Sequence, residues 1–396
     1  MTPYLLLAAL AWAVASRGGT SLRDLVVVLG LLVVALIAGR AWPRRGVVLW
    51  AAFAALLCWL VIVGLLRTGW TLETVRVPLL VVIAALIALV VGRMGARERD
   101  TLVTGLIIVG CLQSMIALGE LAMTLSTELS LSPRAGALLG SANGLGMLLV
   151  VTSVLTAREA DRHGGWLPVA ALLLQAVALL ATSSRTAILI ASVLLIGYIA
   201  AHAGWKRALL GAAGFAAAAA VVVWRTAGGQ HEDRPDLWGE ALRRIADQPL
   251  LGEGPAPAPF TPAVPGARIT TYAHNEILQW GVEYGVVGVG LGLLVVILAL
   301  RSTRRQIGGD LWLRFAALAL LSSGLTDFTL RITALALTAA ALTALAVTRH
   351  GPTTLDAGHL PMSGGSIGGT RPAFSHIPAV PDNSGRTGRS PDETTG

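Results

Sequence analysis

The sequence predicts an all-α, polytopic membrane protein with about twelve transmembrane helices and one long outer loop before the tenth. Of its 396 residues, 55% are hydrophobic and only 13% are charged, and the mean hydropathy is +0.71. A soluble protein would carry about 25% charged residues. In addition, long apolar runs alternate along the chain with short loops that carry most of the Arg residues, which is typical of a protein that crosses the membrane repeatedly.

Twelve apolar runs qualify as spanning helices, each of which needs about 17 to 25 residues once its flanks are included. Short polar turns separate the seventh run from the eighth and the eleventh from the twelfth. We expect the helix cores at 3–16, 25–39, 46–66, 77–92, 101–124, 143–157, 166–182, 186–204, 207–224, 277–300, 312–326 and 332–348.

The charges in the loops predict the orientation of these helices, because cytoplasmic loops carry an excess of Lys and Arg. With a cytoplasmic N-terminus, the cytoplasmic loops hold thirteen basic residues and the short outer loops hold seven, Arg331 among them. Both termini are therefore expected in the cytoplasm. The net charge of +8 is explained by these loops, so no nucleic-acid partner is predicted. The first residues lack a basic start and are interpreted as a spanning helix, not as a signal peptide.

One outer loop, from about 225 to 273, is much longer than the others. Within it, the stretch DLWGEALRRIADQP places Leu237, Ala241 and Ile245 on one face, which predicts a short amphipathic helix. This helix either lies on the membrane surface over the bundle or packs as an ordinary loop helix. Residues 1–350 are thus expected to form one membrane domain.

The remaining residues, 351–396, are rich in Gly, Pro, Ser and Thr and have few large apolar side chains. Such a composition buries too little apolar surface to fold alone, so we expect a disordered cytoplasmic tail. The two cysteines, Cys58 and Cys111, both lie in apolar runs. Neither a disulfide framework nor a cysteine metal site is predicted.

Ionisable residues at the ends of apolar runs are costly there, which makes them candidates for function. Arg185, in ATSSRTAILI, occupies a very short break between two runs. It is either an anion-binding residue that faces a cavity or a loop residue that reaches the interface, and the neighbouring hydroxyls favour the first. Arg134 and Asn143, in SPRAGALLGSANGLG, are either site residues or a loop charge and a helix N-cap. Arg76 and Arg234 are weaker candidates, since outer loops carry arginines in any case.

The stretch TYAHNEILQWGVEYGVVGVG places His274 at the mouth of the tenth apolar run. Histidine titrates near about pH 6.5, so a neutral imidazole that can act as a base is available at pH 7. Glu276 and Glu283 share a helix face with Trp280, and that face is expected to point at a cavity or at another helix. A metal site that combines His274, Glu276 and His231 lacks a recognisable ligand spacing, so no metal or cofactor is predicted.

These residues, in this order, resemble the O-antigen ligase and polymerase superfamily of bacterial envelopes. The resemblance rests on four stretches between Arg134 and Gly290, about 160 residues in all. They are SPRAGALLGSANGLG, SSRTAILIAS, LWGEALRRIADQPLLGEGP and AHNEILQWGVEYGVVG. Each stretch alone is weak, but the family pattern has the same motifs in the same order.

The resemblance implies a metal-independent, inverting glycosyltransferase in the bacterial cytoplasmic membrane, with its active site facing outward. The donor would be a glycan on undecaprenyl pyrophosphate, and the acceptor a hydroxyl of a glycan, lipid or protein. In ligases the acceptor is the lipid A core of lipopolysaccharide, whereas in polymerases it is a second lipid-linked repeat. The compact outer loop favours the ligase type. A polysaccharide or lipid transporter is the main alternative from another class, but it would show paired broken helices in two related halves. A non-catalytic membrane scaffold is a third hypothesis.

By the same resemblance, Arg185 would stabilise the departing pyrophosphate and His274 would orient or deprotonate the acceptor hydroxyl. A groove between helices would hold the polyprenyl chain. Whether Glu276 or Glu283 supports the histidine stays open. The residues expected to bind pyrophosphate or glycan are Arg134, Arg76, Arg234, Asn143, Glu276 and Glu283.

Overall fold

The computed structural model divides the chain into two compact units, Met1–Gly351 and Pro352–Gly396. All residues whose structure is described belong to the first unit, so the expected tail lies outside them. The described residues are 1–19, 21–38, 47–69, 71–127, 134–203, 211, 213, 216, 220, 234–261, 269–304, 310–325, 327 and 329–347.

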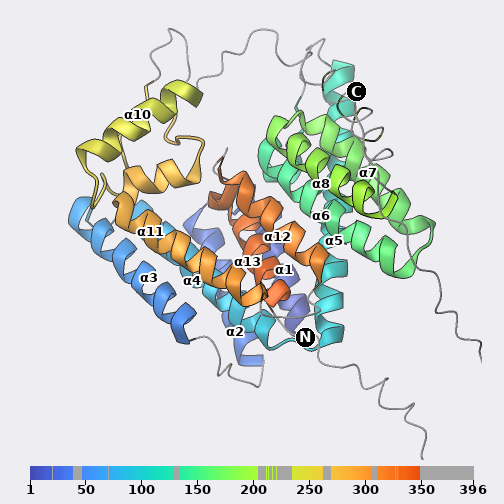
Figure 1. Ribbon diagram of the computed structural model, residues 1–396, viewed down its shortest axis with the longest axis horizontal. Helices are drawn as coiled ribbons and strands as arrows, with labels where there is room; N and C mark the ends of the chain where they lie inside the picture. The colour runs from blue at the N-terminus through green and yellow to red at the C-terminus, as the bar shows by residue number, and fades with distance from the viewer. Residues whose placement is uncertain are drawn as a thin grey trace, which may run out of the picture. The chain divides into compact units, whose positions relative to one another are not determined.

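Over these ranges the secondary structure is helical, apart from turns and an isolated β-bridge between Phe260 and Thr270 (Figure 1). The α-helices are α1 (Thr2–Ala15), α2 (Leu22–Ala38), α3 (Val47–Arg67), α4 (Leu72–Gly92), α5 (Ala96–Thr127), α6 (Ala142–His163), α7 (Trp166–Thr182), α8 (Arg185–Ala203), α10 (Arg234–Asp247), α11 (Glu276–Arg304), α12 (Leu311–Ser323) and α13 (Thr333–Val347). Two short 3-10 helices, η1 (Ala137–Leu139) and η2 (Thr329–Arg331), complete them.

Four of the helices, α3, α4, α5 and α11, are long and apolar enough to cross a membrane. Five shorter apolar helices, in α1, α7, α8, α12 and α13, have 10–17 residues. The expected all-helical fold is therefore confirmed over the described residues and is consistent with a membrane protein, whereas the number of twelve spans and the outer position of the long loop stay predictions. The run expected at 207–224 lies almost entirely outside the described residues. The amphipathic helix expected in the long loop is α10.

Side-chain caps explain where several helices begin. Thr71 accepts a hydrogen bond from the amide of Thr74 at the start of α4, and Ser141 accepts one from Gly144 at the start of α6. These are the usual partners of orphan amides at a helix N-terminus. Ser141 thus takes the capping position that the sequence also allowed for Asn143. The amide group of Asn143, inside the first turn of α6, makes other contacts.

The buried apolar residues form three clusters. The largest joins α1, α2, α4, α5, α6, α7, α8, α12 and α13. A second joins α3, α4 and α11, and a third lies between α10 and α11. The helix of the long loop is therefore packed on α11 through Leu237, Ala241 and Ile245, the face that the sequence predicted to be apolar.

Helix α11 is interrupted at Gly285, which has φ 67° and ψ −176°. The segment that follows α10 fills the break, since the amide of Val286 donates to the carbonyl of Pro249 at 2.8 Å. A Cβ atom at position 285 would lie 2.1 Å from the carbonyl oxygen of Leu250. Only glycine combines this left-handed φ with so close a backbone approach.

The same segment satisfies carbonyl groups that the break leaves without a partner in the helix. The amide of Glu253 donates to the carbonyl of Val282 at 2.7 Å, and the amide of Gly254 donates to the carbonyl of Glu283 at 3.0 Å. Unsatisfied backbone groups are costly at membrane depth. The motifs PLLGEGP and VEYGVVG, which are separate in the sequence, are thus the two sides of one contact.

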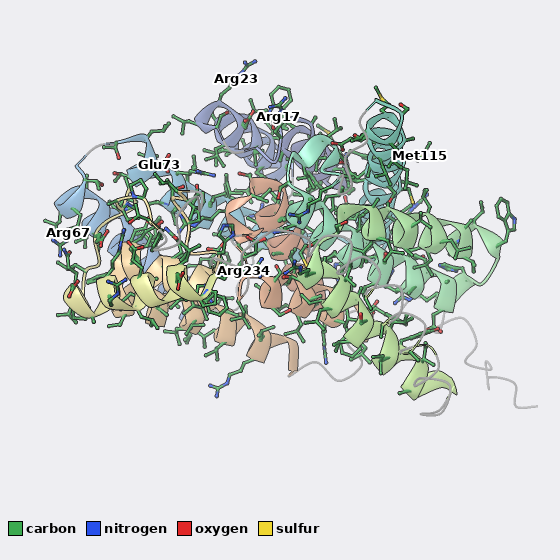
Figure 2. The ribbon with its side chains drawn as sticks, turned by 90° about the horizontal axis from the view of Figure 1, so that it is seen from above. Arg17, Arg23, Arg67, Glu73, Met115 and Arg234 are labelled. Carbon is green, nitrogen blue, oxygen red and sulfur yellow. The ribbon has the colours of Figure 1, made fainter. Side chains whose placement is uncertain are left out.

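Several loops between helices meet at one end of the bundle. The amide of Ala334 donates to the carbonyl of Gly18 at 3.2 Å, and the amide of Ala135 donates to that of Ala181 at 3.2 Å. These contacts join the loop after α1 to the start of α13, and the loop before α6 to the end of α7. We call the end of the bundle where these loops meet the His274 end. Figure 2 shows the molecule from above, with Arg17 of the loop after α1 and Arg234 of α10 labelled.

Candidate functional site

Four side chains from distant parts of the chain form a continuous line of polar contacts at the His274 end. Nδ1 of His274 lies 3.2 Å from Oδ1 of Asp327. The other carboxylate oxygen of Asp327 accepts a hydrogen bond from Nδ2 of Asn143 at 2.6 Å. The amide oxygen of Asn143 in turn accepts one from Nη2 of Arg134 at 2.8 Å. We call these four residues the polar row.

The backbone around His274 is held in place from both sides. Its φ of 51° is in the left-handed region, which is uncommon for a residue with a side chain and persists where the surroundings enforce it. The side chain of Asn275 caps α11, because its Oδ1 accepts a hydrogen bond from the backbone amide of Leu278 at 3.1 Å. Its Nδ2 donates to the carbonyl of Leu325 at 2.7 Å. The amide of Glu276 donates to the carbonyl of Gly324 at 2.7 Å. The start of α11 is therefore tied to the segment that carries Asp327.

Positive charge gathers at the other end of the polar row. Arg134 also donates from Nε to the carbonyl of Thr182 at 3.4 Å, next to the turn from which Arg185 begins α8. Burial lowers the pKa of Arg134, and the guanidinium groups of Arg185 and Arg234 lower it further, while Asp327 opposes them. Three arginines and one aspartate thus interact here, with a formal charge of three minus one, or +2.

A second group of charges, the Arg331 cluster, lies beside the polar row. Nη2 of Arg331 donates to Glu283 at 2.7 Å, and its Nε lies 3.5 Å from Glu276. The guanidinium is 5.6 Å from the ring centre of Tyr272, and the carbonyl of Arg331 accepts from Arg76 at 3.3 Å. Burial lowers the pKa of Arg331, but Glu283 and Glu276 more than compensate and raise it, so the group stays charged.

Gln279 connects the Arg331 cluster to the segment of the chain that precedes His274. Its Nε2 donates to Glu283 at 2.6 Å, and its Oε1 accepts from the amide of Ala273 at 2.8 Å. Glu276 and Glu283 are buried, with 7% and 1% of their surface exposed. The face that they share therefore points into the protein, as the sequence predicted.

The structure groups the candidate residues into two sets. Arg134, Asn143 and His274 belong to the polar row, and Arg185 and Arg234 act electrostatically on Arg134. Arg76, Glu276 and Glu283 belong to the Arg331 cluster, and both glutamates pair with Arg331. His231 lies outside the described residues. Within those residues, no group of three His, Cys, Asp or Glu side chains has the geometry of a metal site.

Two buried residues of these groups, Asp327 and Arg331, were not selected from the sequence. The sequence pattern does not single out Asp327, and it marks Arg331 only as a loop charge. Both occur in SGLTDFTLRIT, the short break between the last two apolar runs. An acid and a base in so short a break are the signal that would have identified them, by the argument already applied to Arg185.

Comparison with known families adds one finding. Residues 170–291 match the family model described as O-antigen ligase. The matched segment holds Arg185, Arg234 and His274, whereas Arg134 and Asp327 lie outside it. No curated protein matches the chain in a sequence comparison.

Proposed function

We propose that this chain, in which residues 170–291 match the O-antigen ligase family model, transfers a glycan from undecaprenyl pyrophosphate to an acceptor hydroxyl. The reaction is of the ligase type and occurs at the outer face of the bacterial cytoplasmic membrane, with both chain termini in the cytoplasm. The observation that carries the proposal is the polar row, which connects a histidine backed by a carboxylate to a group of three arginines.

The arginines provide the site for the donor. A departing pyrophosphate develops negative charge, and fixed positive groups that face it lower the barrier to its departure. Guanidinium groups suit this task because their planar donors match two phosphate oxygens at once. Arg185 contacts the leaving group in the proposed reaction, and Arg134 and Arg234 hold the rest of the pyrophosphate. The formal charge of +2 around Arg134 supports this assignment.

His274 acts as the base. When the Nδ1–H of His274 donates a hydrogen bond to Asp327, the imidazole keeps its lone pair on Nε2, where it can take the proton of the acceptor hydroxyl. The hydroxyl oxygen bonds to the anomeric carbon as the bond from that carbon to the pyrophosphate oxygen breaks. The electron pair leaves with the pyrophosphate, the proton moves to His274, and one displacement inverts the anomeric centre.

Asp327 and Asn143 are positioning residues in this scheme. Asp327 orients the imidazole, and Asn143 links that carboxylate to Arg134, so the base and the anion site are held at a constant spacing. The Arg331 cluster stabilises the neighbouring segment through Glu283, Gln279 and the backbone before His274. Neither glutamate is needed beside the ring, because Asp327 already occupies the Nδ1 side.

A polymerase of the same superfamily would use the same chemistry on a second lipid-linked repeat. A transporter is less favoured, because the break in α11 is filled by Pro249–Gly254 of the long loop and not by a second broken helix. Transporters of that type pair two broken helices at their substrate site.

The test is glycan transfer in a deletion strain that carries the wild type, His274→Ala, Arg185→Ala or the control Arg23→Ala, at matched expression. Arg23 is exposed and lies in the first turn of α2. The wild type and the control should restore the glycoconjugate, and the two site variants should accumulate lipid-linked glycan. The chain-length ladder of the product separates ligase from polymerase. Full complementation by both site variants would overturn the proposal.

A further inference from the structure

A carboxylate of α5 holds the turn that follows Arg134. Oε2 of Glu120 accepts a hydrogen bond from the backbone amide of Ala137 at 2.8 Å and another from that of Gly136 at 3.1 Å. Hydrogen bonds from backbone amides to an ionised carboxylate are roughly twice as strong as those between neutral groups. Glu120 is 16 and 17 positions away from these two partners, so the contact ties η1 back to the helix that precedes it.

The turn at this contact contains strained backbone. Ala137 has φ 47°, in the left-handed region, which a residue with a side chain adopts where its surroundings enforce it. In the described part of the chain, the other residues of this kind are Arg17, Ser183 and His274, which also lie in loops of the His274 end. Strained residues cluster at functional sites. The turn at Ala137 therefore resembles the segments that present His274 and Arg185.

The same turn delivers Arg134 to the polar row. On its other side it is bound to the end of α7, since the amide of Ala135 donates to the carbonyl of Ala181 at 3.2 Å. Nε of Arg134 donates to the next carbonyl, that of Thr182, at 3.4 Å. Residues 134–137 are thus hydrogen-bonded to α7 at one end and to α5, through Glu120, at the other.

This geometry gives Glu120 a positioning task and not a chemical one. Its Oε2 already accepts from two backbone donors, and the carboxylate that contacts His274 is that of Asp327. What the turn requires is a hydrogen-bond acceptor at this place. An amide oxygen on a side chain of the same length would meet that requirement.

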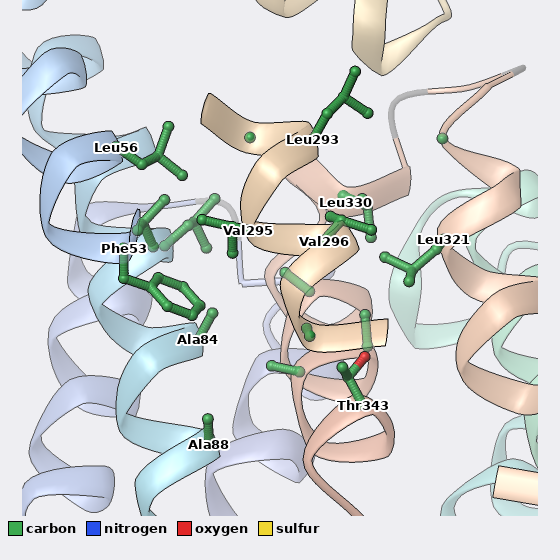
Figure 3. Close-up of a pocket in the computed structure, with 18 of the residues that line it drawn as sticks. Phe53, Leu56, Ala84, Ala88, Leu293, Val295, Val296, Leu321, Leu330 and Thr343 are labelled. Atoms are coloured by element: carbon green, nitrogen blue, oxygen red, sulfur yellow. The ribbon is translucent and has the colours of Figure 1, made fainter. Parts of the chain in front are cut away.

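The contact is also separate from the apolar cavity between α3, α4, α11 and α13 (Figure 3). This cavity has a volume of about 780 Å³, and its described lining includes Glu276 and Arg331 but neither Glu120 nor a residue of the polar row. A change at Glu120 should therefore act on the binding of a charged head and leave the walls of the cavity as they are.

We propose that Glu120 is a positioning residue of the anion site, whose carboxylate fixes the turn 134–137 so that the guanidinium of Arg134 is presented at a constant place. Its importance for the pyrophosphate of the donor rests on the function proposed above. Without this acceptor, the backbone of Ala137 can relax and Arg134 can shift. A shift of about 1 Å in such a group can cost as much as 10²-fold, and the remaining contacts with α7 limit the loss.

Steady-state kinetics separate this role from a general loss of stability. Glu120→Ala should raise the KM for the lipid-linked donor by about three- to tenfold. The value of kcat should stay nearly unchanged, because other contacts hold His274. Glu120→Gln should behave like the wild type, since its amide oxygen can accept both hydrogen bonds. Glu98→Ala is the matched control, because Glu98, near the start of α5, accepts from the exposed amide of Gly95 at 3.1 Å, and it should leave KM unchanged.

Two further measurements do not depend on transfer. In lipid nanodiscs, Glu120→Ala should weaken the binding of farnesyl pyrophosphate by a similar factor. Its binding of farnesol, which has the same chain without the charged head, should equal that of the wild type. Hydrogen–deuterium exchange of the peptides that cover residues 134–141 should be faster in Glu120→Ala and unchanged in Glu98→Ala.

Glu120 is exposed, so its variants should fold. If Glu120→Ala does not accumulate, Glu120→Asp should give the same rise in KM, because its carboxylate is one methylene too short to reach both amides. Unchanged KM and exchange in Glu120→Ala would overturn the inference. So would equal impairment of Glu120→Gln and Glu120→Ala, since the charge and not the acceptor would then matter. A wild type that binds farnesyl pyrophosphate but transfers no glycan would contradict the proposed function instead.

Discussion

The two ends of the helix bundle both bring arginines together, but in different ways. At one end Arg158 of α6 is 1% exposed and pairs with Asp310, Glu159 and Asp100. Arg162 adds a second guanidinium, 2.9 Å from Asp310. Three carboxylates therefore enclose two arginines. At the His274 end, Arg134 is exposed and interacts electrostatically with one carboxylate, Asp327, and with two further arginines, Arg185 and Arg234.

This difference shows that burial of charge alone does not identify a site. The group around Arg158 is saturated with partners and joins α5, α6 and α12, which is a structural task. The polar row has an accessible histidine, and Arg185 and Arg234 beside it add an excess of positive charge, so this end retains capacity for an anion and a proton. Four predictions test the comparison, in order of the expected effect.

The largest effect is expected at His274. His274→Gln should lower the rate of glycan transfer by about 10²- to 10⁴-fold, the usual contribution of a general base. The side chain of His274 is 29% exposed, so the protein should remain folded. Single-turnover transfer with purified, thermally characterised protein measures both properties. A variant that is folded and retains more than about a tenth of the wild-type rate is inconsistent with a base at this position.

Arg158→Ala should have the opposite profile. Removing one partner from a buried ion group leaves uncompensated charge and destabilises a protein by about 3 to 5 kcal/mol. We expect a lower unfolding temperature in detergent and less protein in the membrane, with unchanged activity per folded molecule. A fully stable variant that has lost transfer activity would place function at this end as well.

Asp327→Asn should have an intermediate effect on the rate. The amide keeps the size of the carboxylate but cannot hold the imidazole in the same tautomer, and loss of such a partner typically costs about 10- to 100-fold. The loss should appear in kcat, with KM for the donor nearly unchanged, and the pH profile of kcat should shift. A change in KM alone would indicate that Asp327 binds substrate instead of orienting His274.

The smallest effect is expected at Arg134. Arg134→Lys keeps the charge but loses the planar donors, so the affinity for the lipid-linked donor should fall by about tenfold. Arg162→Lys is the control at the other end, since Arg162 is also exposed but pairs with the carboxylate of Asp310, and it should leave donor affinity unchanged. Equal effects of both substitutions would remove the distinction between the two ends.

The sequence by itself determined the membrane fold class, the helices of the described residues and most of the candidate residues. Apolar runs, capping residues and breaks are local signals, and a charge at the end of an apolar run is visible without any partner. His274, Arg185 and Asn143 were selected in this way. The amphipathic face of α10 was predicted for the same reason, because its periodicity lies within one short segment.

Only the tertiary structure decided which of these residues meet. Asn143 and Asp327 are 184 positions apart, and His274 and Asp327 are 53 positions apart. The pairing of both glutamates with Arg331, and the filling of the break at Gly285, likewise join segments that share no local pattern. Such contacts depend on how the helices pack against one another, and periodicity along a single helix does not contain that information.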